Sequence, residues 1–187
     1  MRLRWVLALS LLPIGLLTAE WKENGKAVPD KPWARSAGDF GAQLVFTDDP
    51  DGLIETWEKP GPAALQHGIA NAPRDGNIVA VIFFFGCAAD AKGSCQTSVR
   101  FTAYGPDGKP WGDPQDADLW SKPPPGKGLM QLGIGTMGLV LDPDDPLGVY
   151  KVKAEVSDKV AKKTLVLERM VTVVEGEEEE ADDAEGV

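Results

Sequence analysis

The stretch NIVAVIFFFGCAADAKGSCQTSVRFTAY, residues 77–104, joins two strand patterns through a loop that carries both cysteines of the chain. Residues 77–86 form an unbroken apolar run rich in β-branched and aromatic side chains, which is typical of a strand buried on both faces. Residues 98–103 instead alternate between polar and apolar side chains, as in a strand with one buried face. The stretch predicts a mostly β protein in which residues 81–85 form a buried central strand.

The N-terminal residues 1–19 have the layout of a secretory signal peptide. Arg2 and Arg4 precede an apolar run, residues 5–17, and small residues follow it, so cleavage after Ala19 is expected. The run of about 13 residues is shorter than the roughly 20 that a membrane-spanning helix needs. We therefore expect a periplasmic or secreted protein that does not insert into a membrane once the signal peptide is removed.

Cys87 and Cys95 are separated by seven residues, and such a pair could form a disulfide, bind a metal or act as a redox site. Cysteines usually pair in an oxidising compartment. Structural zinc takes four thiolate or imidazole ligands, and the only histidine is the distant His67. A redox site would have a C-x-x-C motif, which is absent. We expect a disulfide, worth about 2–3 kcal/mol, that fixes the register of a hairpin between neighbouring antiparallel strands.

One short helix is predicted before the buried strand. Asp49 is a good N-cap, and Pro50 suits the first helical position. Leu53, Ile54 and Trp57 then fall on one helical face, so we expect this short N-terminal helix to cover one edge of the core.

The C-terminal half of the chain is rich in strand patterns. Apolar alternation at residues 130–134 predicts one strand, and residues 148–158 alternate most clearly. The apolar segment 163–174 changes phase at Glu168 and Arg169, which predicts a bulge or a strand that crosses between sheets.

Short strands and turn signals at this spacing predict an Ig-like antiparallel β-sandwich over residues 41–174. The segment PDDPLGVYKVKAEVSD, followed by LVLERMVTV, resembles the end of many bacterial extracytoplasmic Ig-like modules, in which a G-x-Y-x-V-x-A-x-V-x-D strand pairs with a final apolar strand. The matching residues are Gly148, Tyr150, Val152, Ala154, Val156 and Asp158. The resemblance, mainly over residues 142–174, implies a fold and a compartment, because a fold of this type carries no function on its own.

The segments that flank the sandwich are polar. Residues 20–40 contain prolines and glycines without a period, and we expect an extended N-terminal arm. Residues 175–187, EGEEEEADDAEGV, hold eight acids and no base, which predicts a disordered acidic tail. Without this tail and the signal peptide, the formal net charge changes from −10 to −4, and the body shows no basic surface that would bind nucleic acid.

Catalytic motifs are missing. The chain has no G-x-S-x-G, and His67 would have to serve every histidine-dependent mechanism. The glycines of GIGTMG, residues 133–138, do not match a dinucleotide-binding loop, since no helix follows, and are expected to let strands approach closely or bend. Pairs of acids leave a carboxylate-dependent enzyme open as a remote alternative. We expect no catalysis and no cofactor.

Two tryptophans and a stiff loop are the candidate binding residues. Trp111 and Trp120 lie outside the strongest strands, and KPPPGKG, residues 122–128, contains three consecutive prolines. Aromatic side chains beside a rigid loop predict a docking edge, whereas the competing interpretation is that they plug the open ends of the sandwich. The candidate residues are Trp111, Trp120, Pro123, Pro124 and Pro125.

Acidic loops give only a weak candidate for calcium. Asp142, Asp144 and Asp145 share one loop, and Asp113, Asp116 and Asp118 lie in another. Calcium takes clustered carboxylates, but Asp-Pro pairs are also ordinary turn chemistry, and the EF-hand spacing is absent.

The sequence thus favours a non-catalytic binding or structural module that engages an envelope or extracellular protein, through β-edge pairing or the Trp- and Pro-rich loop. A carbohydrate-binding module that uses exposed tryptophans is the alternative.

Overall fold

The computed structural model describes residues 22–23, 26–59 and 68–176. The expected signal peptide, His67 and residues 177–187 of the acidic tail lie outside these ranges. Within the described part of the chain, no helix is long and apolar enough to cross a bilayer.

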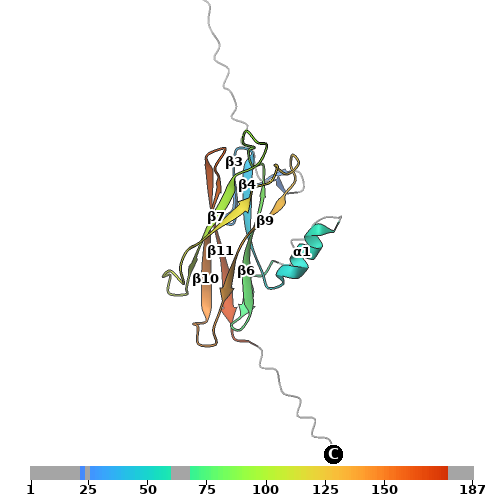
Figure 1. Cartoon of the computed structure of the whole chain (residues 1–187). Helices are drawn as coiled ribbons and strands as arrows, with labels where there is room; N and C mark the ends of the chain where they lie inside the picture. Colours follow the sequence, from blue (N-terminus) through green and yellow to red (C-terminus); the bar gives the residue numbers. More distant parts are fainter. Residues whose placement is uncertain (1–21, 24–25, 60–67, 177–187) are drawn as a thin grey trace, which may run out of the picture.

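Two sheets pack face to face (Figure 1). The first sheet has, in spatial order, β3 (Ala34–Ala37), β4 (Phe40–Thr47), β6 (Asn77–Phe85) and β9 (Gln131–Val140). The second has β5 (Asn71–Pro73), β11 (Lys163–Val174), β10 (Gly148–Asp158), β7 (Thr97–Tyr104) and β8 (Gln115–Trp120). One helix, α1 (Pro50–Glu58), and a small hairpin of β1 (Lys22–Glu23) and β2 (Lys26–Ala27) complete the described elements.

The strand order confirms the predicted mostly β, Ig-like sandwich. β4, β6 and β9 are arranged like strands A, B and E of an Ig-like domain, and β7, β10 and β11 like strands C, F and G. One pairing departs from the antiparallel rule, because β5 runs parallel to β11. The chain reaches β5 after α1, so it leaves the first sheet at the end of β4 and enters the second sheet.

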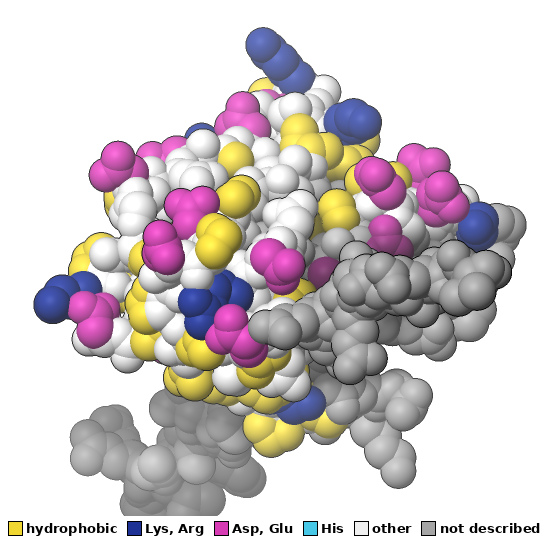
Figure 2. All heavy atoms as spheres, turned by 90° about the horizontal axis from the view of Figure 1, so that it is seen from below, with side chains coloured by type: hydrophobic (Ala, Val, Ile, Leu, Met, Phe, Trp, Pro, Cys, Tyr) yellow, Lys and Arg dark blue, Asp and Glu magenta, His cyan; other side chains and the backbone are white. Residues whose placement is uncertain are grey.

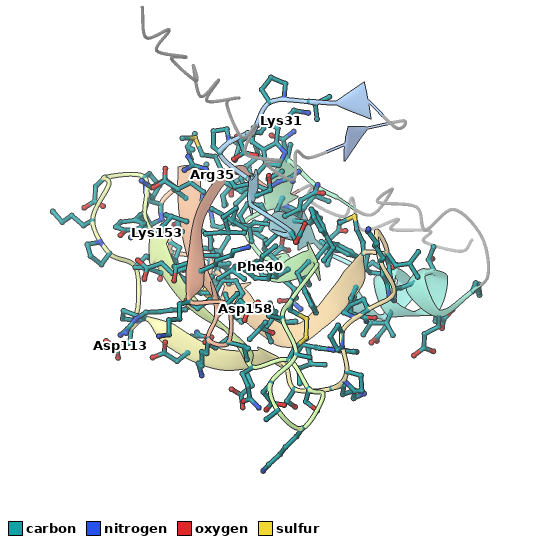
Figure 3. All side chains as sticks on the ribbon, turned by 90° about the horizontal axis from the view of Figure 1, so that it is seen from above. Lys31, Arg35, Phe40, Asp113, Lys153 and Asp158 are labelled. Atoms are coloured by element: carbon teal, nitrogen blue, oxygen red, sulfur yellow. A yellow bond between two sulfur atoms is a disulfide. The ribbon has the colours of Figure 1, made fainter. Side chains whose placement is uncertain are left out.

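β6 is the central strand that the apolar run predicted. It pairs with β4 on one side and β9 on the other. Ile78, Ile82 and Phe84 are fully buried between the sheets, and Phe40 of β4 lies there as well (Figure 3). The alternate side chains of β6 point to the outer face of the sheet, where Val81 and Phe83 are buried beneath α1.

α1 covers the outer face of the first sheet and not an edge of the core. Asp49 accepts a hydrogen bond from the Gly52 amide at 2.9 Å, which confirms the predicted N-cap. Leu53 packs against Val81 and Phe83, and the Trp57 and Phe83 rings lie 5.0 Å apart. Ile54 is 46% exposed, so the prediction that it shares the buried face is wrong.

The predicted phase change in the last strand is also wrong. β10 and β11 pair without a shift from Gly148↔Val173 to Asp158↔Lys163. Arg169 therefore occupies a position that faces the other sheet, where its guanidinium donates to the Leu44 carbonyl at 3.0 Å. A charged residue at an inward position imitates a phase change in the sequence, although the backbone continues regularly.

The glycines of β9 let another strand approach, as expected. Gly135 faces inward, and a Cβ there would lie 2.8 Å from the backbone oxygen of Asp118 in β8. Gly133 leaves room for the side chain of Leu119 from the same strand. The strand predicted from the alternation at residues 130–134 is present as part of β9. Because the glycines take the inward positions, its apolar residue Ile134 points outward and is 61% exposed.

The segment expected to be an extended arm takes part in the sandwich. β3 pairs with β4, so the first sheet begins before residue 41. The Pro32 carbonyl accepts from the Glu168 amide at 2.8 Å, and the Trp33 carbonyl accepts from the Leu44 amide at 2.8 Å. This segment therefore bridges the two sheets along one side.

Candidate interaction surface

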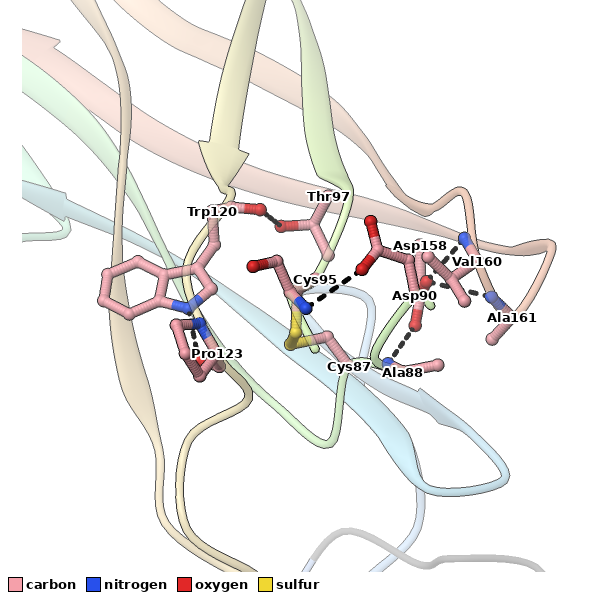
Figure 4. Close-up of a disulfide and its surroundings, with 11 residues drawn as sticks. Cys87, Ala88, Asp90, Cys95, Thr97, Trp120, Pro123, Asp158, Val160 and Ala161 are labelled. Carbon is pink, nitrogen blue, oxygen red and sulfur yellow. Dashed lines mark hydrogen bonds between the residues drawn. A yellow bond between two sulfur atoms is a disulfide. The ribbon is translucent and has the colours of Figure 1, made fainter. Parts of the chain in front are cut away.

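The Cys87–Cys95 disulfide is present, with a Cα–Cα distance of 5.9 Å, and both side chains are buried (Figure 4). It does not close a hairpin, because β6 and β7 belong to different sheets. The prediction of a hairpin staple is corrected in this respect: the disulfide ties the loop by which the chain crosses from the first sheet to the second. We call this end of the molecule the disulfide end.

Asp158 holds the disulfide end together from the second sheet. Its buried carboxylate accepts from the Ala88 amide at 2.8 Å and from the Val160 and Ala161 amides at 3.0 Å (Figure 4). The crossing loop and the β10–β11 turn are thus joined through one side chain. Asp158 is the last residue of the motif that resembles extracytoplasmic Ig-like modules, and its role here is structural.

The two candidate tryptophans lie at opposite ends of β7. Trp120 pairs with Thr97 at the start of β7, and the Trp111 amide donates to the Ala103 carbonyl near its end. Over the eight residues of β7 the separation is about 25 Å, so the two rings do not form one surface.

Each of these tryptophans is half-buried against the core. The Trp120 ring lies 5.9 Å from the Phe84 ring, and its indole nitrogen donates to the Pro123 carbonyl at 3.0 Å. The Trp111 ring meets the Tyr150 ring edge-on at 5.7 Å. This geometry favours the interpretation that they plug the ends of the sandwich. Pro124 and Pro125 continue the loop beyond Trp120.

The acidic loop after β9 uses its side chains in a turn. The Asp145 carboxylate accepts from the Asp142 amide at 2.7 Å, and the Asp145 amide donates to the Asp142 carbonyl at 2.9 Å. Asp144 is exposed. Across the described residues, no three His, Cys, Asp or Glu side chains are placed to hold a metal ion.

The free edges of the two sheets differ in how they are protected. β3 has four residues and includes Arg35, β5 has three residues and ends in Pro73, and β8 carries two aspartates. Short length, proline and charge all discourage a further strand from pairing. β9 has none of these features: it has ten residues, and residues 131–141 contain neither a charged residue nor a proline.

The lower half of β9 is a regular strand with one open edge. It pairs with β6 from Asn77↔Val140 to Val81↔Thr136, and a register shift follows near the inward glycines. Within the described residues, no backbone hydrogen bond joins β9 to any strand other than β6. Val140 is 71% exposed, so an exposed apolar side chain lies beside the unpaired backbone groups of this edge. We call residues 136–140 the β9 edge.

Sequence reasoning named edge pairing as a mode of contact but did not locate the strand. Alternation identifies which face of a strand is buried, but it does not tell whether a strand has one neighbour or two. The available signal was the run of uncharged, proline-free residues from 130 to 141.

Comparisons with known proteins give no family. No protein-family model matches the chain, and no curated protein matches it. Among solved structures, a family 123 glycoside hydrolase from Clostridium perfringens aligns with 74% of this chain and 28% of its own, at 8% identity and a TM-score of 0.42. A β-glucuronidase from Parabacteroides merdae aligns with 52% of this chain and 11% of its own, at 16% identity and a TM-score of 0.31. The chain thus spans only a minor part of either enzyme.

Proposed function

We propose that this protein is a non-catalytic module of the periplasm or the cell exterior that binds a protein partner by adding a strand to the β9 edge. The observation that carries the proposal is the open, uncharged and proline-free edge of β9 beside three protected edges. In such complexes, backbone hydrogen bonds provide affinity, and alternate side chains provide specificity.

The compartment is part of the same proposal. The first 19 residues have the layout of a signal peptide. The disulfide supports an oxidising environment, since structural disulfides persist outside the cytosol.

The carbohydrate-binding alternative has less support. Trp111 and Trp120 each pack on the core and lie at opposite ends of β7, so a sugar ring would not contact both.

Two matched lysine substitutions test the β9 edge. Val140→Lys places a charge on the open edge strand, whereas Val149→Lys places one on β10, an inner strand of the other sheet. Both valines are exposed, at 71% and 47%, so neither substitution removes core packing. We expect Val140→Lys to abolish capture of a specific partner from an envelope extract and Val149→Lys to retain it.

Amide hydrogen exchange locates the contact. Partner binding should slow exchange in residues 136–140, because their free backbone groups become paired. Equal capture by both variants, or protection confined to another strand, would disprove strand addition at β9.

A further inference from the structure

Exposed or half-exposed lysines gather at the disulfide end. The loops that carry them are joined: the Cys95 amide donates to the Lys122 carbonyl at 3.0 Å, and the Lys159 amide donates to the Gln96 carbonyl at 2.9 Å. The lysines are Lys92, Lys122, Lys159, Lys162 and Lys163. None of these lysine side chains forms an ion pair with another described residue.

The acids at the disulfide end offset only part of this charge. Asp158 is buried and bound to three amides. Asp90 accepts from the Ser94 and Lys92 amides and from the Gln96 side chain, so its carboxylate is directed into its own loop. Asp39 is the other acid in these turns, and Asp118 of β8 lines one surface pocket together with Lys159. The exposed Lys127 in the loop after Trp120 is a further cation, so the lysines of this end still outnumber its acids.

The opposite end is acidic. Figure 2 views this end from below and shows Asp and Glu side chains spread across it. Its loops and chain ends carry Asp48, Asp75, Asp142, Asp144 and Glu175. Arg74 and Lys109 are cations of these loops, and both are already paired, Arg74 with Glu175 at 2.6 Å and Lys109 with Asp107 at 3.1 Å.

β11 ends at this acidic end (Figure 1), and the acidic tail follows it in the sequence. Its own end of the body repels it, since both carry negative charge. Glu177, Glu178, Glu179 and Glu180 follow Gly176 directly. Four residues reach at most about 14 Å, whereas β11 alone is about 36–40 Å long. The lysines of the same molecule are therefore out of reach of these four glutamates.

We propose that the lysines of the disulfide end bind the four consecutive glutamates Glu177–Glu180 of a second copy of this chain. The two surfaces differ, so the contact is heterologous and joins molecules head to tail. It is electrostatic and therefore salt-dependent, because the charges on both sides are exposed.

Sedimentation velocity at varied salt tests the proposal on the mature chain. We expect self-association at about 0.01 M salt, where the Debye length is about 30 Å, and monomers at about 1 M salt, where it is about 3 Å. Truncation after Gly176 and the double variant Lys92→Glu/Lys159→Glu should each remain monomeric at low salt. The control Lys59→Glu/Lys109→Glu changes the net charge equally at highly exposed sites away from the disulfide end, and it should still associate.

A mixture of the two inactive partners gives the sharpest result. The truncated chain keeps the lysines, and the double variant keeps the tail, so together they should form a one-to-one dimer at low salt. A wild-type protein that is monomeric under all conditions, or a mixture that does not pair, would overturn the proposal. Val140→Lys should associate like wild type, which separates this contact from the one proposed at the β9 edge.

Discussion

Single side chains at inward positions explain where the sequence pattern was misleading. Arg169 lies in line with Leu167 and Val171, and its guanidinium stacks near the rings of Trp33 and Phe46, at 5.9 and 6.0 Å. Burial lowers the pKa of Arg169, but a guanidinium stays charged at any physiological pH. The guanidinium of Arg169 thus takes an inward position that an apolar side chain would usually occupy, and it is stabilised there by one hydrogen bond and two aromatic rings.

Tyr150 has the same combination of burial and one polar contact. Its hydroxyl donates to the Pro146 carbonyl at 2.9 Å, in the manner of the tyrosine corner of Ig-like domains. Burial raises the pKa of this hydroxyl, so it remains a donor over the whole working range. Tyr150→Phe should destabilise the fold by about 1–2 kcal/mol, because the carbonyl loses its partner. Tyr104→Phe, in a half-exposed ring, should change the free energy of unfolding in urea by less than about 0.5 kcal/mol.

Asp90 predicts a pH dependence of stability at the disulfide end. The Ser94 amide, the Gln96 side chain and the Lys92 amide lower the pKa of its carboxyl below 3.8. Because the pKa is lower in the folded state, the ionised carboxylate stabilises the fold at any pH above the pKa of the unfolded state. This contribution is lost as the pH falls through the pKa of the folded state. Asp90→Asn should therefore melt below wild type at pH 6, and the difference should shrink below about pH 4. A difference that is constant with pH would contradict this assignment.

At the scale of elements, β9 owes its position to glycine. The inward glycines remove the side chains that would otherwise separate β9 from β8, and the two sheets close together along this side. The same residues leave the outward side of β9 with Ile134 and Val140, so the close packing inside and the exposed apolar side chains outside have one origin.

Two glycine substitutions in β9 separate these effects. A Cβ at Gly135 would meet Asp118 backbone oxygen at 2.8 Å and Ala117 at 3.0 Å, whereas a Cβ at Gly138 would meet nothing within 4 Å. Gly135→Ala should destabilise by about 1–3 kcal/mol through overpacking. Gly138→Ala should be neutral or slightly stabilising, since alanine restricts the unfolded chain. Chemical denaturation of the pair measures both, and equal effects would refute the close approach.

At the scale of the whole molecule, the disulfide joins the two sheets. β6 and β7 share no backbone ladder, so the Cys87–Cys95 bond and the amide of Ala88 on Asp158 secure the crossing between them. Both sulfurs are buried, so reductant should act mainly through the unfolded state.

Thermal unfolding with and without reductant checks this role. Reductant, or Cys87→Ser with Cys95→Ser, should lower the free energy of unfolding by about 2–3 kcal/mol for so short a loop. Partner capture through the β9 edge should persist in the folded double variant, because the disulfide lies at the other end of β6 from the Asn77↔Val140 pair. Unfolding that does not respond to reductant would contradict a stabilising role.

The sequence by itself determined most of the long strands, the helix N-cap, the cysteine pair and the sandwich class, but not the short strands β3, β5 and β8. These features depend on local periodicity, capping chemistry and the number of cysteines, which are all visible within short windows. It also identified glycine in β9 as a sign of close approach between strands.

Only the tertiary structure decided which strands are neighbours. Alternation of polar and apolar residues identifies the buried face of a strand. It does not identify the strands that pair with it on either side, because pairing joins residues far apart in the chain. For this reason the sequence predicted that the cysteines close a hairpin, whereas they join the two sheets. For the same reason it predicted one docking edge for Trp111 and Trp120, which lie at opposite ends of β7. The open edge of β9 and the lysines of the disulfide end became visible for the same reason: both are products of strand order in space.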